Sequence, residues 1–164
     1  MKTFARYAAL GVLFAGIAAT TAAEAKLKRI TIGSNKQGSV FFLLASGFAK
    51  TLQQNLKIRS TAQPHAGSSV YLPLMDNGEI TMGLNNSMDS GAAVRGKLPF
   101  RSKSSNVRAI ARVWVIPYAF MVRADSGLKT IADLRGKKVV TKMSSIVSLT
   151  NLNIAMLRGG GLST

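Results

Sequence analysis

Three polar loops in this sequence carry the groups that could bind a small molecule. They are Gly33–Ser39, Pro64–Ser69 and Asn85–Ser87. The first loop ends at Ser39, where the spacing of apolar residues becomes that of a helix. The backbone N–H groups of such a loop, together with the positive end of the following helix, suit an anion. Gly33 and Gly38 have the spacing of a nucleotide-binding P-loop, but Ser39 stands where that motif needs a lysine, which argues against such a loop.

The first loop also has a simpler interpretation. It could be an ordinary strand-to-helix turn in which Ser39 only caps the helix, since serine is a preferred residue at that position. Taken alone, the loop leaves both interpretations open. The repetition of polar loops along the chain is what favours a binding site.

Each polar loop stands between a strand-like stretch and a helix-like stretch. We expect strands at 29–32, 57–63 and 80–84, a helix from Val40, and short helices at 70–76 and 88–95. Strands that alternate with helices predict an α/β fold with a parallel sheet and right-handed crossovers. The loops that follow parallel strands meet at one edge of the sheet, where ligands bind in such folds.

The second half of the sequence continues with further strand-like runs. Two of them fill residues 107–123 and are broken near Pro117. A turn follows at 124–127, and Thr130–Asp133 has the spacing of a capping box. We expect a fourth strand at 137–141, a loop at 143–145 and a helix at 146–157.

The first 25 residues resemble a secretory signal peptide. Lys2 and Arg6 precede an apolar stretch at 7–19, and Ala23-Glu24-Ala25 fits the small-x-small cleavage pattern. We therefore expect a periplasmic or otherwise secreted protein that begins at Lys26. An uncleaved N-terminal anchor is the alternative, although the stretch is short for a membrane span.

The chain is strongly basic, with 22 Lys and Arg against 6 Asp and Glu and a net charge of +16. Removal of the leader takes away two cations and one anion, which leaves +15 on the mature chain. Such a charge attracts polyanions, so a basic polyanion-binding module is one alternative function. The cations are dispersed and no aromatic residues are interleaved with them, so we expect no nucleic acid partner.

Enzyme chemistry has little support in the sequence. There is no cysteine, and the single histidine, His65, has no evident acidic partner for a catalytic triad. The six acids form no close pair, and no group has the spacing of metal ligands. We therefore expect neither a catalytic residue nor a metal or cofactor. His65 follows Pro64 in a turn, which favours a position facing solvent.

Four stretches of the sequence resemble the TAXI family, the extracytoplasmic solute receptors of tripartite (TRAP) transporters. They are ITIGSNKQGSVFF, PHAGSS, NGEITMGLNNS and FMVRADSGLKTIADLRGKKVV, and the likeness covers essentially all of residues 28–158. The resemblance implies a type II periplasmic-binding-protein fold with two lobes. Residues 26–136 would form the first lobe, and 137–164 would begin a second lobe that this sequence does not complete.

The resemblance also implies a function and a set of binding residues. Members of the family bind a small solute, often one that bears a carboxylate, and deliver it to a membrane permease. The positions that match the family's ligand loops are Ser34, Asn35, Gly38, Ser39, Gly67, Ser68, Asn86, Ser87, Ser144 and Ser145. Phe41 and Phe42 stand where a tyrosine pair is common, which predicts a more apolar pocket. A non-functional receptor fragment is the remaining alternative.

Overall fold

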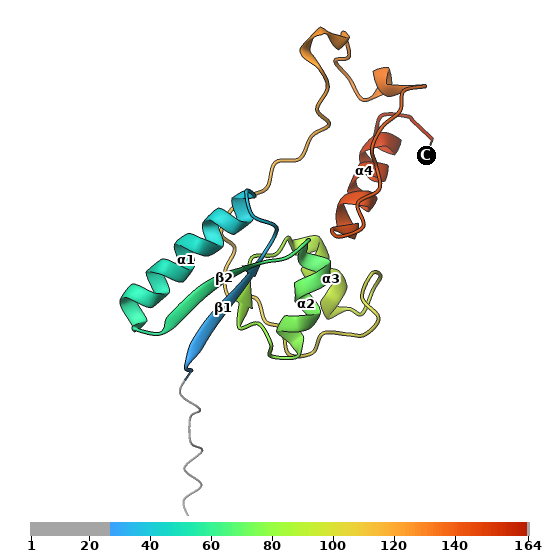
Figure 1. The fold of residues 1–164 in the computed structure, drawn as a ribbon. Helices are drawn as coiled ribbons and strands as arrows, with labels where there is room; N and C mark the ends of the chain where they lie inside the picture. Colours follow the sequence, from blue (N-terminus) through green and yellow to red (C-terminus); the bar gives the residue numbers. More distant parts are fainter. Residues whose placement is uncertain (1–26, 164) are drawn as a thin grey trace, which may run out of the picture.

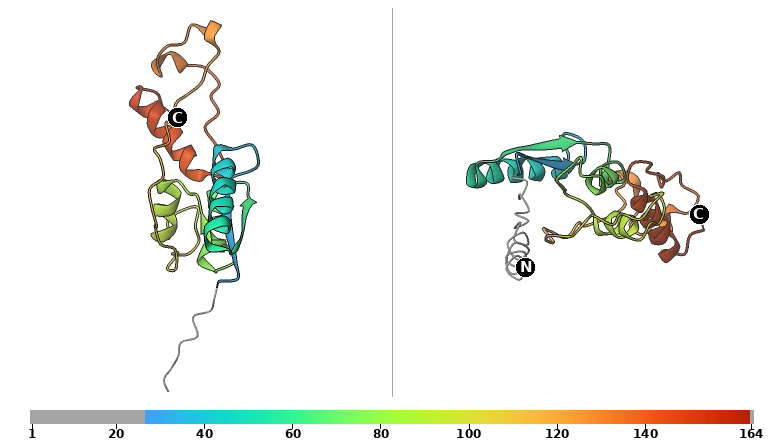
Figure 2. Two further views of the ribbon diagram at one scale, coloured as in Figure 1. Left: turned by 90° about the vertical axis from the view of Figure 1, so that its left-hand side faces the viewer. Right: turned by 90° about the horizontal axis from the view of Figure 1, so that it is seen from below.

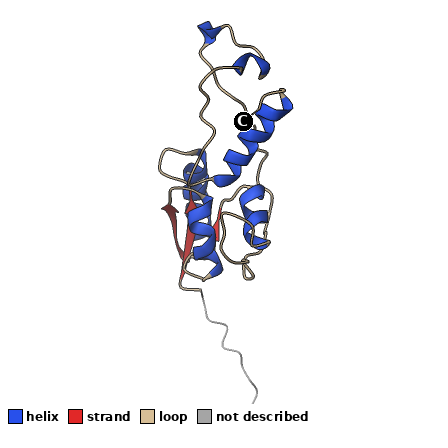
Figure 3. Ribbon diagram, turned by 90° about the vertical axis from the view of Figure 1, so that its right-hand side faces the viewer, coloured by secondary structure: helices blue, strands red, loops and turns tan. Residues whose placement is uncertain are grey.

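The computed structural model describes residues 27–163, so the predicted leader lies outside the described residues. Figure 1 shows the elements, and Figure 3 shows that the strands are confined to the N-terminal part of the chain. In chain order they are β1 (Arg29–Ser34), α1 (Val40–Leu56), β2 (Arg59–Pro64), α2 (Ser68–Asp76), β3 (Met82–Gly83), α3 (Ser87–Val94), two 3-10 turns, η1 (Ala124–Ser126) and η2 (Ala132–Leu134), and α4 (Val147–Gly159).

The three strands form one parallel sheet in the order β2-β1-β3. In its register Ile30 pairs with Ser60, and Ile32 pairs with both Ala62 and Met82. Helix α1 packs against β1 and β2, whereas α2 contacts β1 and β3 (Figure 1). The predicted α/β class with a parallel sheet flanked by helices is confirmed, and the sheet resembles part of a periplasmic-binding-protein lobe.

Strand β1 is the centre of the sheet and is buried from Ile30 to Ser34. The strand expected at 29–32 is therefore confirmed, and it extends to Ser34. A strand between two parallel neighbours, with helices packed around it, has both faces covered, so both sets of side chains are buried. Thr31 tolerates this burial because its backbone N–H donates to Oγ1 of Thr81, and its own Oγ1 accepts from the backbone N–H of Thr81 at 3.0 Å.

Helix α1 approaches the sheet through small side chains. Ala45 and Ala49 are buried and form a core cluster with Ile30 and Ile32. Phe48, by contrast, is 39% exposed. The helix and the sheet meet closely through the alanines, and this turns the larger aromatic side chain toward the margin of the contact.

A second core cluster joins α2, α3 and the loop that follows α3. Leu72 and Ala93 are fully buried, and Phe100 is 6% exposed. Helix α2 begins at Ser68, two residues earlier than expected, and accommodates Pro73. Helix α3 covers residues close to those predicted. This cluster packs the middle of α2 against the end of α3.

Residues 107–123 and 137–141 form no strand within the described part of the chain, so the strands expected there are wrong. Figures 1 and 2 show them as extended loops that lead away from the sheet and back toward α4. A strand is stable only when a neighbour pairs with its N–H and C=O groups, and no described segment does so. The predicted helix near the C-terminus is confirmed as α4, which contacts α3.

Candidate functional site at the strand ends

The carboxyl ends of the three strands lie side by side. Ser34 pairs with Pro64 at the ends of β1 and β2, and Gly33 pairs with Gly83 of β3. Beyond these pairs, the backbone N–H of His65 donates to the carbonyl of Ser34 at 2.9 Å. The three polar loops therefore begin at one edge of the sheet, as the parallel topology requires.

The first loop is held by hydrogen bonds within itself and to its neighbour. Ser39 caps α1, since its Oγ accepts from the backbone N–H of Phe42 at 3.2 Å and donates to the carbonyl of Lys36 at 2.7 Å. The capping interpretation of Ser39 is thus confirmed. Ser34 is fully buried, and its Oγ donates to the carbonyl of Gln63 at 3.3 Å. Gly38 has a φ of +84°, which favours glycine.

The second and third loops meet around the buried carboxylate of Asp89. The side chain of Ser68 donates to one oxygen of this carboxylate, and Nδ2 of Asn86 donates to the same oxygen at 2.9 Å. Asn86 also caps α3, because its Oδ1 accepts from the backbone N–H of Asp89 at 2.7 Å. Buried charges are tolerated when they accept several hydrogen bonds, so Asp89 ties the two loops together.

The start of α4 extends this network. The backbone N–H of Ser148 donates to the second carboxylate oxygen of Asp89 at 3.3 Å. The neighbouring loop lies so close to Gly67 that a Cβ atom there would overlap the carbonyl oxygen of Ser145 and lie 2.7 Å from Cγ1 of Ile146. Ser145 is half-buried and Ser144 is exposed. The loop before α4 therefore rests on the second loop of the sheet edge.

Four buried polar atoms in these loops have no hydrogen-bond partner within residues 27–163. They are Oδ1 of Asn35, Nε2 of His65, Oγ of Ser69 and Oδ1 of Asn85. Buried polar atoms in proteins are nearly always paired, and an unpaired one costs free energy. Asn35, His65 and Asn85 each stand immediately beyond a strand or within two residues of its end.

Tyr71 packs beside one of these residues, His65. Its ring centroid lies 5.5 Å from that of His65, and its hydroxyl donates to the carbonyl of Leu84 at 2.5 Å. Burial raises the pKa of Tyr71, and the negative charge of Asp89 raises it further. Tyr71 is therefore a neutral hydrogen-bond donor under the strand-end loops at any ordinary pH.

Some of the predicted site residues already form hydrogen bonds within the protein, whereas others are exposed. Those of the three strand-end loops gather at one edge, and Ser145 reaches that edge through the contact with Gly67. The hydroxyls of Ser34, Ser39 and Ser68 and the amide of Asn86 are engaged in internal hydrogen bonds. Ser87 and Ser144 are exposed.

Sequence reasoning missed His65, Ser69, Asn85 and Asp89. The expectation that His65 faces solvent is wrong, because its side chain is half-buried and Nε2 is inaccessible. The backbone bond from His65 to Ser34 draws the residue over the sheet. Asp89 carries a readable pattern, since an Asn three residues before an acid has the spacing of a capping box. No comparable pattern marks Ser69 or Asn85.

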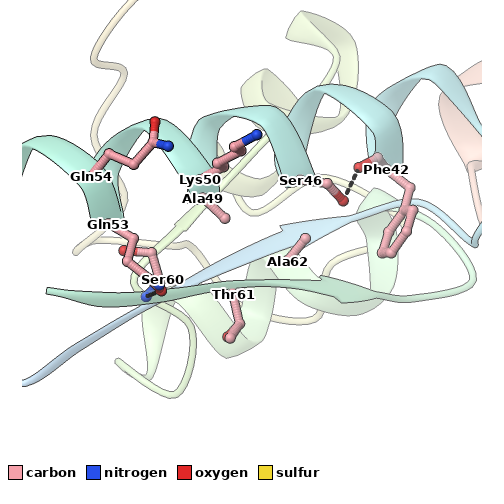
Figure 4. A pocket seen from close by; sticks show the side chains of 9 residues that line it. All are labelled: Phe42, Ser46, Ala49, Lys50, Gln53, Gln54, Ser60, Thr61 and Ala62. Carbon is pink, nitrogen blue, oxygen red and sulfur yellow. Dashed lines mark hydrogen bonds between the residues drawn. The ribbon is translucent and has the colours of Figure 1, made fainter.

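A shallow groove lies elsewhere, between α1 and β2. Its volume is about 570 Å³, and Figure 4 shows its lining of Phe42, Ser46, Ala49, Lys50, Gln53, Gln54, Ser60, Thr61 and Ala62. None of the unpartnered atoms lies in its walls. The groove follows the free edge of β2, and we assign the candidate site to the strand ends instead.

A family model described as the NMT1-like family matches residues 32–145, well over half of the chain. The chain belongs to the NMT1-like family. This family has the periplasmic-binding-protein-like character of solute receptors, and its members are solute-binding proteins that are typically extracytoplasmic. Neither a curated protein nor a solved structure gave a significant match to the chain.

The NMT1-like match includes the first strand-end loop, the second, the third and the loop before α4. All the residues that surround Asp89 except Ser148 therefore fall within the matched region. No helix in residues 27–163 is long and apolar enough to cross a membrane.

Proposed function

We propose that this NMT1-like protein is an extracytoplasmic receptor that binds a small carboxylate-bearing solute at the strand-end loops. It would deliver the solute to a membrane permease of the TRAP type. The observation that supports the proposal best is the set of four unpartnered buried atoms at one edge of the sheet. A solute that supplies hydrogen bonds to them would offset the cost of burying them unpaired.

The chemistry around Asp89 limits where the carboxylate of the solute can lie. Ser68 and Asn86 already donate to Asp89, so a second carboxylate beside them would meet a like charge. The first loop has no such charge. It presents the start of the 17-residue helix α1, and Lys36 is exposed within it. The carboxylate would therefore lie nearest Lys36 and the start of α1, where the helix dipole is favourable, and a donor group of the solute would meet the accepting Oδ1 of Asn35.

The division into lobes remains a proposal that the start of α4 supports. In it, residues 26–136 form the first lobe and 137–164 begin the second. Ser145 and Ser148 contact the loops of the first lobe from across the chain. Such contacts are the kind that close over a bound solute and exclude water. Ser144 would join the site only if this loop moved inward.

Isothermal calorimetry on the exported protein tests the proposal. Glutamate, glutamine, 2-oxoglutarate and short dicarboxylates are titrated in turn, and at least one should give saturable heat. The Asn35→Ala and Asn85→Ala variants should each weaken binding about tenfold, the effect of one lost hydrogen bond in a buried site. Asn55→Ala, on the exposed face of α1, serves as the matched control and should leave binding unchanged.

Two results would contradict the proposal. The absence of heat from every carboxylate would exclude this class of solute. Binding that survives both strand-end variants but is lost with substitutions at Lys50 and Gln53 would move the site to the groove beside α1.

A further inference from the structure

The loop that follows α3 is a basic feature of the described chain that the proposed function does not use. We call residues 95–108 the basic loop. It carries five exposed cations and no acid: Arg95, Lys97, Arg101, Lys103 and Arg108. Within residues 27–163 the one ion pair joins Arg123 to Asp125, so no cation of the basic loop is in an ion pair. The carboxylate of Asp76 is hydrogen-bonded to the loop through the backbone N–H of Asn106.

The basic loop is a built structure rather than a loose connection. The backbone N–H of Ser104 donates to the carbonyl of Ala93 at 2.9 Å, and that of Lys97 donates to the carbonyl of Ala92 at 2.8 Å. Gly96 has a φ of +61° and lies against Lys103, which closes the ends of the loop on each other. Phe100 points inward and is buried against the cluster that joins α2 and α3.

This loop also exposes an apolar side chain. Leu98 is 85% exposed and lies between Lys97 and Arg101 in the sequence. A single exposed leucine is unremarkable on its own. Here it belongs to a fixed loop whose other exposed side chains are cations and small polar residues, with no acid among them. Amphipathic elements that enter the surface of a bilayer combine the same two properties, cations for the headgroups and an apolar residue for the acyl boundary.

The basic loop and the strand-end site lie at opposite ends of α3. The helix begins beside Asn86 at the sheet edge and has eight residues. At a rise of roughly 1.5 Å per residue it therefore separates the two regions by about 12 Å. In Figure 1 the loop projects on the far side of α3 from the start of α4. A surface that bound the loop would leave the strand-end site open.

We propose that the basic loop docks the protein on an anionic lipid surface, with Leu98 at the acyl boundary and the surrounding cations on phosphate headgroups. A nucleic acid fits less well, because single strands are bound by exposed aromatic rings and Phe100 is buried. A protein partner also fits less well, because a specific protein interface needs a broad complementary area. Cations on one short loop can bind an anionic surface without such shape complementarity.

Co-sedimentation with lipid vesicles tests the proposal on the exported protein. Vesicles of phosphatidylcholine with phosphatidylglycerol should bind it at low salt, and those of phosphatidylcholine alone should not. Replacing Lys97, Arg101 and Lys103 together by glutamine should weaken the binding roughly ten- to a hundredfold, from the usual contribution of each cation near an anionic membrane. Leu98→Ser, which keeps all charges, should weaken it severalfold.

The control variant removes the same charge elsewhere. Arg29→Gln, Lys50→Gln and Arg59→Gln together change three exposed cations near the other end of the sheet and should leave vesicle binding nearly unchanged. Equal losses from both triple variants would overturn the proposal in favour of net charge alone. The absence of binding to anionic vesicles would also overturn it. So would binding to a DNA oligonucleotide or to inorganic polyphosphate that is tighter than the binding to vesicles and is abolished in the loop variant. Thermal melting of each variant shows that it remains folded.

Discussion

Residues 107–146 are richer in apolar side chains than residues 29–106, yet the two regions differ in what they build. In the first region, strand-like runs pair with one another, and two helices cover them. In the second, equally strand-like runs stay extended, and Ile110, Val115 and Met121 are at least 67% exposed. Apolar residues with strand propensity therefore form a strand only where a neighbouring strand supplies the hydrogen bonds.

The largest expected difference between the two regions is in the free energy of unfolding when an apolar side chain is truncated in each. Leu72→Ala should lower the free energy of unfolding by about 2–5 kcal/mol, because Leu72 is fully buried and leaves a cavity. Val115→Ala should change it by less than about 0.5 kcal/mol, since Val115 is 67% exposed. Urea unfolding measures both. Equal losses would show that the extended region is packed in solution.

The second prediction concerns the hydrogen bond that joins the first region to α4, the helix that follows the second region. Asp89→Ala should cost about 1–3 kcal/mol, because it leaves the side chains of Ser68 and Asn86 and the N–H of Ser148 without their acceptor. Limited proteolysis should then cut before α4 faster than in the wild type. Asp76→Ala, which removes a carboxylate bonded to the exposed backbone N–H of Asn106, is the control and should have a smaller effect.

The third prediction compares two serines that accept backbone hydrogen bonds. Ser39→Ala removes the cap of a 17-residue helix in the first region and should cost about 1 kcal/mol. Ser126→Ala removes an acceptor for the N–H of Leu128 in an exposed turn of the second region, and it should be nearly neutral. Thermal melting of both variants decides the matter. A larger loss at Ser126 would contradict the comparison.

The smallest effect is a titration in the second region. Hydrogen bonds from the backbone N–H groups of Lys129 and Thr130 lower the pKa of Asp133 below its ordinary value of 3.8. A lowered carboxylate pKa adds stability that is present above the unfolded pKa and is lost as pH falls through the folded pKa. NMR of the Asp133 carboxyl carbon should show a midpoint below 3.8. A midpoint at or above that value would mean that the turn is open.

Local patterns in the sequence predict most of the first region. The helix from Val40, the cap at Ser39 and the parallel order of strands all follow from spacing, turn residues and the rule for alternating elements. The burial of both faces of β1 does not, because it depends on which elements cover the sheet. The strands expected at 107–123 failed for the related reason that pairing is set by a partner and not by the run itself.

The location of the candidate site at the strand ends could be predicted from the sequence, but the contacts among its residues could not. The polar loops after Ser34, Pro64 and Gly83 follow from the parallel topology. The hydrogen bonds that Ser68 and Asn86 donate to the carboxylate of Asp89 could not be predicted from the composition of the loops. That carboxylate comes from within the next helix. The contact of Gly67 with Ser145 joins residues far apart in the chain, and sequence spacing contains no information about it.

The contact between Trp114 and Phe41 has a practical consequence. Trp114 is the single tryptophan of the chain, and its ring lies edge-on to that of Phe41, with centroids 5.2 Å apart. It thereby joins the extended segment to the first turn of α1, beside the first strand-end loop. Its emission spectrum is a built-in optical reporter of that joint, without any attached dye. A red shift on mild heating would reveal detachment of the segment before the sheet itself melts.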